Sequence, residues 1–318
     1  MTESNHKGES NMENNKIYDV IVIGGGPGGY TAALYSARAE LSTLVLEKFS
    51  PGGQMATTDI VENYPGFPEG ISGFELGLQM KAGAERFGVK SKLAEVLSVD
   101  LESNPKVIKT KKQTYEAKTV ILATGAFPRE LGLPNERELR GRGVSYCATC
   151  DGMFYKGKTV VIVGGGNTAV ADAIYLAKIC EKVYLVHRRD ELRASKTYMD
   201  ALEKTENIEF LWSSEVTAVH AEQMVTGVTV RNKKDGSESF VKADGVFVAI
   251  GNIPNTDLIK GQVTLDEAGY VLADETTRTN IPGVFAVGDM RQKPLRQIVT
   301  AVADGAVASK YAEEFIYA

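Results

Sequence analysis

Two cysteines with a carboxylate directly behind them are the residues of this chain best suited to redox chemistry. Cys147, Cys150 and Asp151 lie in the segment Cys-Ala-Thr-Cys-Asp, in a chain of 318 residues with only three cysteines. The spacing allows a small-loop disulfide, and one thiol of such a pair can ionise and attack another disulfide. Asp151 can exchange the proton of that reaction, although Asp-Gly at 151–152 is also an ordinary turn signal. The sequence predicts a redox-active disulfide and leaves the role of Asp151 open.

No metal site is expected at these cysteines. A structural zinc site needs four ligands, usually from two pairs, and the sequence has no second cysteine pair. The third cysteine, Cys180, closes a helical pattern at 173–180 and is expected to be a buried, unreactive thiol.

Two glycine-rich segments that flank the cysteine pair repeat one pattern. Residues 19–30 (DVIVIGGGPGGY) align without gaps with residues 159–170 (TVVIVGGGNTAV). Each segment runs from a continuous apolar stretch, typical of a buried parallel strand, through glycines into a helical stretch and then another apolar run. This is the context that a dinucleotide-binding fingerprint requires. The sequence therefore predicts an α/β protein with two Rossmann-like dinucleotide-binding domains.

The turns of these two units are the predicted pyrophosphate sites. Glycine lets the backbone approach a phosphate, and the N–H groups of the following helix point toward it. The predicted contacts are Gly24, Gly26, Pro27 and Gly29 in the first loop and Gly164, Gly166, Asn167, Thr168 and Ala169 in the second.

The residue that ends the second strand of each unit distinguishes the two sites, because in this fold it reaches the adenosine ribose. In the first unit this residue is Glu47, whose carboxylate suits free ribose hydroxyls and repels a 2′-phosphate. The alternative is that Glu47 is only an exposed strand end. The first site is predicted to bind FAD or NAD.

At the same distance from its loop, the second unit has a basic cluster: His187, Arg188, Arg189 and Arg193. Guanidinium groups bind phosphate through charge-assisted hydrogen bonds, so the cluster predicts NADP(H). The alternative is a solvated face in which the arginines pair with the acids at 190 and 191.

Connectors that contain proline or glycine, at 127–134 and 252–255, indicate that the second unit is inserted into the first. A hairpin is predicted at 225–241, with its turn at 234–236. The predicted segments are a disordered tail at 1–16, a first domain at 17–129 and 257–318, and a second domain at 130–256 that carries the cysteine pair.

Composition limits the partners. The net charge of −5 gives no reason to expect nucleic-acid binding. Residues 1–16 lack the apolar core of a secretory signal, and no apolar stretch approaches the ~20 residues of a membrane span. A cytoplasmic protein without a membrane partner is expected.

Taken together, the motifs resemble those of the low-molecular-weight thioredoxin reductases, in order from about residue 17 to the C-terminus. They are GGGPGGYTAALY (24–35), GGQM (52–55), NYPGF (63–67), ATGA (123–126), CATCDG (147–152), GGGNTA (164–169), HRRDELRAS (187–195), PGVFAVGD (282–289) and RQIVTA (296–301). CATCD just before the second nucleotide motif is the most specific of them.

The resemblance implies a homodimer that passes electrons from NADPH through FAD and the Cys147–Cys150 disulfide to oxidised thioredoxin. It implies that Cys150 lies nearest the flavin, that Cys147 exchanges with thioredoxin, and that Asp151 is the acid/base. It further implies that the NADPH domain swivels about the connectors. The implied further FAD contacts are Gly53, Gln54, Asn63, Thr124, Gly125, Asp289, Arg296 and Gln297.

Two other functions remain open from the sequence. One is a reductase of the same fold with another donor, such as ferredoxin, or another acceptor, such as a peroxidase or a glutaredoxin-like protein. The other is a non-catalytic flavin redox sensor whose cysteine pair switches an interaction surface.

Overall fold

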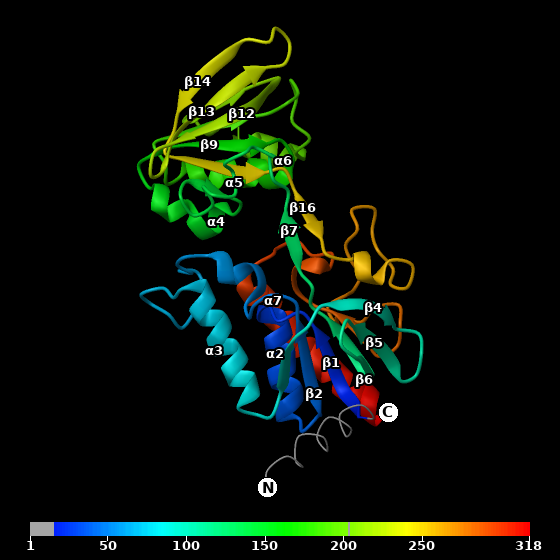
Figure 1. The fold of residues 1–318 in the computed structure, drawn as a ribbon. Coiled ribbons are helices and arrows are strands. Elements are labelled where there is room, and N and C mark those ends of the chain that lie inside the picture. The colour runs from blue at the N-terminus through cyan, green and yellow to red at the C-terminus, as the bar shows by residue number, and fades with distance from the viewer. Residues whose placement is uncertain (1–15, 203) are drawn as a thin grey trace. The chain divides into compact units, whose positions relative to one another are not determined.

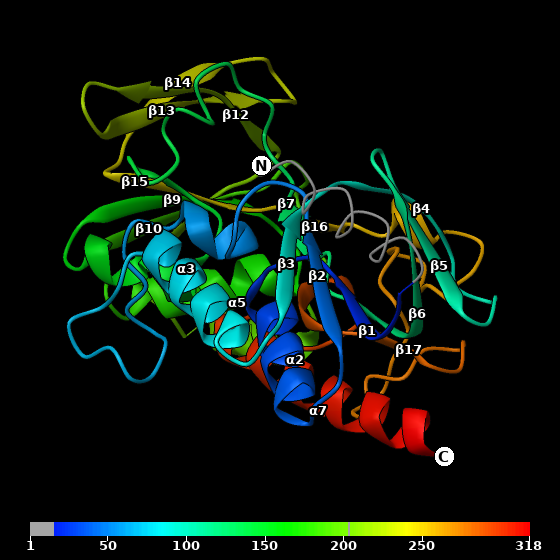
Figure 2. The same cartoon turned by 60° about the horizontal axis from the view of Figure 1, so that its bottom comes forward.

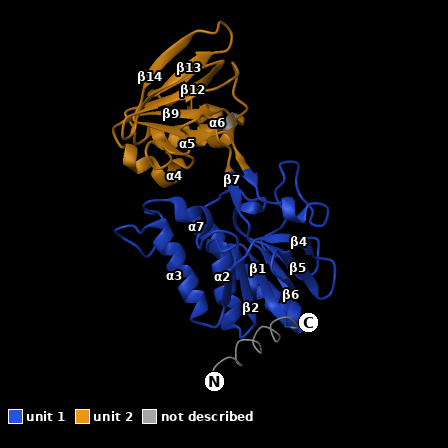
Figure 3. Cartoon of the chain, in the orientation of Figure 1, with its two compact units in different colours: residues 1–127, 253–318 blue, residues 128–252 orange. Residues whose placement is uncertain are grey.

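The computed structural model describes residues 16–202 and 204–318, so the tail predicted at 1–16 lies outside the described residues except for Lys16. The chain divides into two compact units (Figure 3). Unit 1 combines the described part of residues 1–127 with residues 253–318, and unit 2 comprises residues 128–252. Among the described residues, no helix combines the length and the apolar character needed to cross a bilayer.

Unit 1 is built on a seven-stranded sheet (Figure 1). Its strands are β1 (Ile17–Ile23), β2 (Thr43–Glu47), β3 (Lys90–Leu93), β4 (Val96–Asp100), β5 (Lys106–Thr110), β6 (Thr114–Leu122) and β17 (Val284–Ala286). Its helices are α2 (Pro27–Arg38), α3 (Gly73–Glu85) and α7 (Ile298–Tyr317), with 3-10 turns η1 (Gly53–Thr57), η3 (Asp257–Ile259) and η4 (Gly288–Met290). The strand order is β3-β2-β1-β6-β5-β4, with β17 also paired to β6. The pairs β3–β2, β2–β1, β1–β6 and β6–β17 are parallel, whereas β4–β5 and β5–β6 are antiparallel.

Strand β1 is buried on both faces, which explains its continuous apolar run. Val20 and Val22 pack with α2 and α7 on one face, and Ile21 and Ile23 pack on the other face with β4, β5 and the segment after η3. Helices α2 and α7 lie side by side (Figure 2). A Cβ at Gly305 of α7 would lie 2.3 Å from a backbone oxygen of α2, so a glycine is required for this close approach.

Unit 2 repeats this plan around a five-stranded parallel sheet of order β11-β10-β9-β15-β8. Its strands are β8 (Val144–Ser145), β9 (Thr159–Gly164), β10 (Lys182–Val186), β11 (Ile208–Leu211) and β15 (Gly245–Ala249). A separate antiparallel sheet contains β12 (Ser214–Ala221), β13 (Val225–Asn232) and β14 (Glu238–Lys242). The helices are α4 (Ala148–Asp151), η2 (Gly152–Tyr155), α5 (Asn167–Ala177) and α6 (Lys196–Leu202). The predicted hairpin is confirmed as the β13–β14 pair.

The two faces of β9 are covered as those of β1 are. Val160 and Ile162 pack with α5, whereas Val161 and Val163 pack with the β12–β13–β14 sheet. The predicted α/β class with two Rossmann-like units, the second inserted into the first, is confirmed.

The two segments that link the units, β7 (Ala126–Pro128) and β16 (Asn252–Pro254), pair with each other. The Arg129 N–H donates to the Gly251 carbonyl at one end of this pair, and the Asn255 N–H donates to the Gly125 carbonyl at the other, both at 2.9 Å. The domain borders expected after residues 129 and 256, and the hinge role of these connectors, stay predictions.

Candidate active site and dinucleotide sites

The first glycine loop joins β1 to α2. Gly24 has a φ of +108°, and a Cβ there would lie 2.3 Å from the Ala123 carbonyl oxygen, so only glycine fits. Gly26 precedes α2 without a side-chain cap, Pro27 opens the helix, and no described atom lies within 4 Å of a Cβ built at Gly26. The N–H groups of the first turn therefore have room to bind a pyrophosphate.

Glu47 ends β2 beside this loop. Its Oε2 accepts the Gly25 N–H at 2.5 Å, and its Oε1 accepts the Phe49 N–H at 2.9 Å. These bonds fix the carboxylate next to the loop, and each oxygen keeps a further lone pair for a hydroxyl. The contact with ribose hydroxyls remains a prediction, and the position of the side chain suits it.

Asp289 lies in η4, after β17. Its Oδ1 is buried and has no hydrogen-bond partner among the described residues. Burial raises the pKa of Asp289, whereas the nearby Arg296 and Lys293 act to lower it. A buried carboxylate oxygen without a donor suits a ligand that brings hydroxyl groups, as the ribityl chain of a flavin does. The residues present therefore fit the flavin that the resemblance implies.

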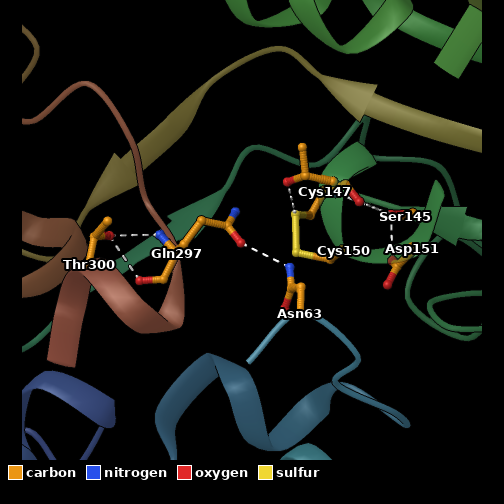
Figure 4. The surroundings of a disulfide bond; sticks show 8 residues. Asn63, Ser145, Cys147, Cys150, Asp151, Gln297 and Thr300 are labelled. Atoms are coloured by element: carbon orange, nitrogen blue, oxygen red, sulfur yellow. Dashed lines mark hydrogen bonds between the residues drawn. A yellow bond between two sulfur atoms is a disulfide. The ribbon is translucent and has the colours of Figure 1, made fainter. Parts of the chain in front are cut away.

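The other predicted FAD contacts also lie in unit 1. Asn63 Nδ2 donates to Gln297 Oε1 at 3.1 Å, a pair visible in Figure 4. Arg296 Nε donates to the Asp289 carbonyl at 3.2 Å. The Thr124 hydroxyl donates to a backbone oxygen at 2.6 Å, and Gln54 Nε2 donates to the Ala126 carbonyl. Gly53 and Gly125 both have positive φ, +57° and +72°.

A buried ionic cluster that sequence reasoning missed supports the turn that carries Asp289. Asp304 of α7 accepts the Gly288 N–H at 2.9 Å, two hydrogen bonds from Arg291 at 2.9 Å each, and one from Lys293 at 2.7 Å. The charged side chains are only 5–8% exposed. The partners are separated along the chain, and no local motif signals their contact.

The second glycine loop repeats the geometry of the first. Gly164 has a φ of +158°, and a Cβ there would lie 2.4 Å from the Ala249 carbonyl oxygen. No described atom lies within 4 Å of a Cβ built at Gly166. Asn167 and Thr168 begin α5 and are exposed, whereas Ala169 is buried. An open helix N-terminus again fits a pyrophosphate.

His187 lies beneath this loop. Its side chain is buried with a residue exposure of 3%, and a Cβ at Gly165 would lie 2.1 Å from the imidazole. Burial lowers the pKa of His187, and the nearby Arg193 and Arg188 act in the same direction. The imidazole packs directly against Gly165 of the loop. Its predicted contact with the nucleotide stays a prediction.

The three arginines after His187 are exposed. The Arg193 N–H donates to the Gly165 carbonyl at 2.7 Å, which holds this segment beside the glycine loop. Asp190, a partner in the alternative interpretation, pairs instead with Lys234 at 2.9 Å. Within the described part of the chain, no ion pair engages the guanidinium groups of Arg188, Arg189 and Arg193. These three guanidinium groups are therefore exposed and accessible to a phosphate.

Cys147 and Cys150 form the predicted disulfide, with their Cα atoms 5.2 Å apart. Cys147 precedes α4, and its carbonyl accepts the N–H groups of Cys150 at 3.2 Å and Asp151 at 3.1 Å. Asp151 thus lies in the same short turn as both cysteines.

Ser145 is a further residue that sequence reasoning missed. Figure 4 shows its hydroxyl between Cys147 and Asp151, with Oγ 2.6 Å from Asp151 Oδ2 and 3.1 Å from the Cys147 N. The sequence shows a serine two residues before Cys147, but its contact with Asp151 depends on the two-residue strand β8, which the sequence pattern did not indicate.

Cys180 is buried, as predicted, and burial raises the pKa of its thiol to about 11. The helical placement was wrong, because α5 ends at Ala177 and Cys180 follows in a turn.

Comparisons with known proteins agree with this architecture. Residues 18–305 match the family model described as "Pyridine nucleotide-disulphide oxidoreductase". A thioredoxin reductase of Peptoclostridium acidaminophilum is 46% identical over 313 residues, which cover 96% of this chain and 99% of the relative. One of Streptomyces clavuligerus is 47% identical over 305 residues, 95% of each chain. The crystal structure of thioredoxin reductase from Streptococcus pyogenes matches with a TM-score of 0.89 and 43% identity, covering 95% of this chain and 99% of the other.

The family match spans most of the chain, and both relatives and the solved structure carry one name. The fold of this chain is therefore that of the solved thioredoxin reductase over 95% of its length. This chain belongs to the pyridine nucleotide-disulphide oxidoreductases, in the group of the thioredoxin reductases.

Proposed function

We propose that the protein is a thioredoxin-disulfide reductase that moves two electrons from NADPH through FAD and the Cys147–Cys150 disulfide to oxidised thioredoxin. The observation that carries the proposal is this disulfide, with Asp151 in the same turn, in the unit that holds the second glycine loop. The relatives named thioredoxin reductase support it across nearly the whole chain. We further propose a cytoplasmic homodimer, on the resemblance alone.

Family membership implies a flavin and a nicotinamide nucleotide. We assign FAD to unit 1, because the Glu47 carboxylate suits free ribose hydroxyls and disfavours a 2′-phosphate, and because the buried Asp289 Oδ1 suits a hydroxyl donor. We assign NADPH to unit 2, because three exposed arginines follow the strand that ends at its ribose position. The bound cofactors supply the two electrons that open the disulfide.

The cysteines then carry out thiol–disulfide exchange. The Cys147 thiolate attacks one sulfur of the partner's disulfide, and the other partner sulfur leaves as a thiolate. The Cys150 thiolate then attacks Cys147 Sγ, which restores the disulfide and releases the partner as a dithiol. Asp151 accepts a proton from an attacking thiol and returns it to a leaving thiolate.

A serine variant of the exchanging cysteine tests the relay. Cys147→Ser is expected to keep reduction of the flavin by NADPH and to lose turnover with thioredoxin. The matched control is Cys180→Ser, which changes the buried thiol outside the disulfide and is expected to retain turnover. Normal thioredoxin reduction by Cys147→Ser would refute the relay.

An anaerobic titration tests the donor and the acceptor. NADPH is expected to bleach the flavin at far lower concentration than NADH, and oxidised thioredoxin is expected to restore the colour. Equal efficiency of the two nucleotides would overturn the assignment of the arginines. Flavin that thioredoxin leaves reduced would overturn the function in favour of another acceptor or a redox sensor.

A further inference from the structure

Ser145 is held firmly by the fold of unit 2. It is the last residue of β8, its exposure is only 3%, and it pairs with Phe247 in the neighbouring parallel strand β15. A buried strand residue with a small side chain has little freedom, so its hydroxyl oxygen has a defined position.

That hydroxyl contacts two parts of the disulfide turn. Ser145 Oγ lies 2.6 Å from Asp151 Oδ2, a short distance typical of a hydroxyl that donates to a carboxylate. It also accepts the Cys147 N–H at 3.1 Å. The Cys147 carbonyl is more distant, 3.4 Å from Oγ, so the single hydroxyl proton is best used on the carboxylate.

The two contacts link the carboxylate to the first cysteine through one buried atom. The Cys147 carbonyl also accepts the N–H of Asp151, so Cys147 and Asp151 are joined both directly through the backbone and through the Ser145 hydroxyl. Any rotation of the Asp151 carboxylate away from Ser145 breaks this hydrogen bond, so the buried hydroxyl fixes the orientation of the carboxylate.

We propose that Ser145 is a positioning residue that orients Asp151 and stabilises its ionised form, so that Asp151 is a base for the cysteine thiols at neutral pH. The inference rests on the proposed acid/base role of Asp151. A donor to a carboxylate favours the charged state, so loss of the hydroxyl makes the carboxylate easier to protonate.

Other titratable groups lie on the elements around this turn. Burial raises the pKa of Tyr155 in η2 to about 12, and burial also raises that of Tyr146. Asp172 lies on α5, which packs against α4, and burial raises its pKa to about 6. Tyr175 of α5 approaches the turn at Gly152. Because this raised pKa of Asp172 lies within the pH range of the test below, only a comparison in which Asp151 is replaced isolates the effect of Ser145.

The test measures thiol–disulfide exchange without nucleotide or thioredoxin. The full-length flavoprotein is reduced with dithiothreitol, freed of it, and mixed with oxidised glutathione between about pH 3 and 8. Acid-quenched samples are alkylated, and mass spectrometry gives the fraction of reformed Cys147–Cys150 disulfide. One protein dithiol and one glutathione disulfide yield one protein disulfide and two glutathione thiols.

At low pH the exchange rate falls as the pH decreases. In Ser145→Ala, this acidic limb is expected to lie about one pH unit higher, so that at a given pH on the limb the exchange rate is about tenfold lower. Ser145→Thr keeps the hydroxyl and is expected to restore the wild-type limb. The control is Ser214→Ala, which removes a similarly buried hydroxyl of unit 2. Among the described residues this hydroxyl donates to the Trp212 carbonyl alone, and no shift is expected.

The decisive comparison is made in an Asp151→Asn background. There, Ser145→Ala is expected to cause no further shift of the limb. A rate lowered equally at every pH, or a shift that persists without the Asp151 carboxylate, would overturn the inference. Failure of the proposed function is visible separately, as normal glutathione exchange in an enzyme that cannot turn over thioredoxin with NADPH.

Discussion

Replacement of Asp304 by asparagine tests how the flavin-side turn is held. The change keeps the size of the side chain and removes one negative charge from a cluster in which Arg291 and Lys293 are 5% and 6% exposed. Both buried cations would then lose the carboxylate that accepts their hydrogen bonds. Breaking a buried ion pair in this way costs about 3–5 kcal/mol, which for a unit of this size lowers Tm by roughly 6–20 °C.

The effect has a defined pH dependence. Burial alone would raise the pKa of Asp304. The hydrogen bonds from Arg291 and Lys293 lower it by more than burial raises it, so the pKa lies below the ordinary value of 3.8. A carboxyl whose pKa is lowered by folding contributes stability above its unfolded pKa and loses it as pH falls through the folded pKa. The difference in free energy of unfolding between wild type and Asp304→Asn should be constant from pH 7 to about 5 and shrink below 3.8.

Thermal unfolding followed by circular dichroism, with flavin release recorded in the same samples, measures both quantities. The matched control is Asp257→Asn, because that carboxylate is 86% exposed and pairs with an exposed Lys260. Its Tm should stay close to that of the wild type. An Asp304→Asn variant as stable as the control, or a stability difference that grows as pH falls below 3.8, would refute the electrostatic argument.

Two further predictions concern the nucleotide loops. Gly29→Ala should destabilise unit 1 by about 3 kcal/mol or more and weaken flavin retention, because its Cβ would lie 2.0 Å from a backbone oxygen. Ala169→Gly, at the matching position of unit 2, should lower the free energy of unfolding by only about 1 kcal/mol. Equal losses of unfolding free energy for the two variants in urea would contradict this prediction. Arg189→Ala should raise KM for NADPH about tenfold or more and leave KM for NADH nearly unchanged. Lys234→Ala removes a nearby exposed cation that already pairs with an acid and is the control, so an equal rise in that variant would mean a general charge effect.

Much of the fold could be predicted because its signals are local. The apolar runs of β1 and β9, the glycines after them and the turn of the β13–β14 hairpin lie within short windows of sequence. Short elements were missed for the opposite reason. Strands β7 and β8 have three and two residues and exist only because a partner strand lies beside them.

The candidate site divides in the same way. The disulfide could be predicted from spacing, whereas the contact between Asp304 and Arg291 depends on how α7 packs against η4. The burial of His187 under Gly165 was also beyond the sequence pattern, which marked only its distance from the glycine loop. Helix α5 ends earlier than its apolar pattern suggested, and the residues that continue the pattern, including the buried Cys180, lie after the helix.

Strand order explains why the disulfide and the second nucleotide loop belong to one unit. All strands of the β11-β10-β9-β15-β8 sheet are parallel, so their carboxyl ends meet at one edge. Strand β8 delivers Ser145 and then Cys147 to this edge, β9 delivers the Gly164 loop, and β10 delivers the arginines that follow His187. Parallel pairing of only two residues in β8 is enough to place the redox turn there. A substitution that weakens this pairing should therefore disturb Ser145, Asp151 and the disulfide together while leaving the nucleotide loop intact.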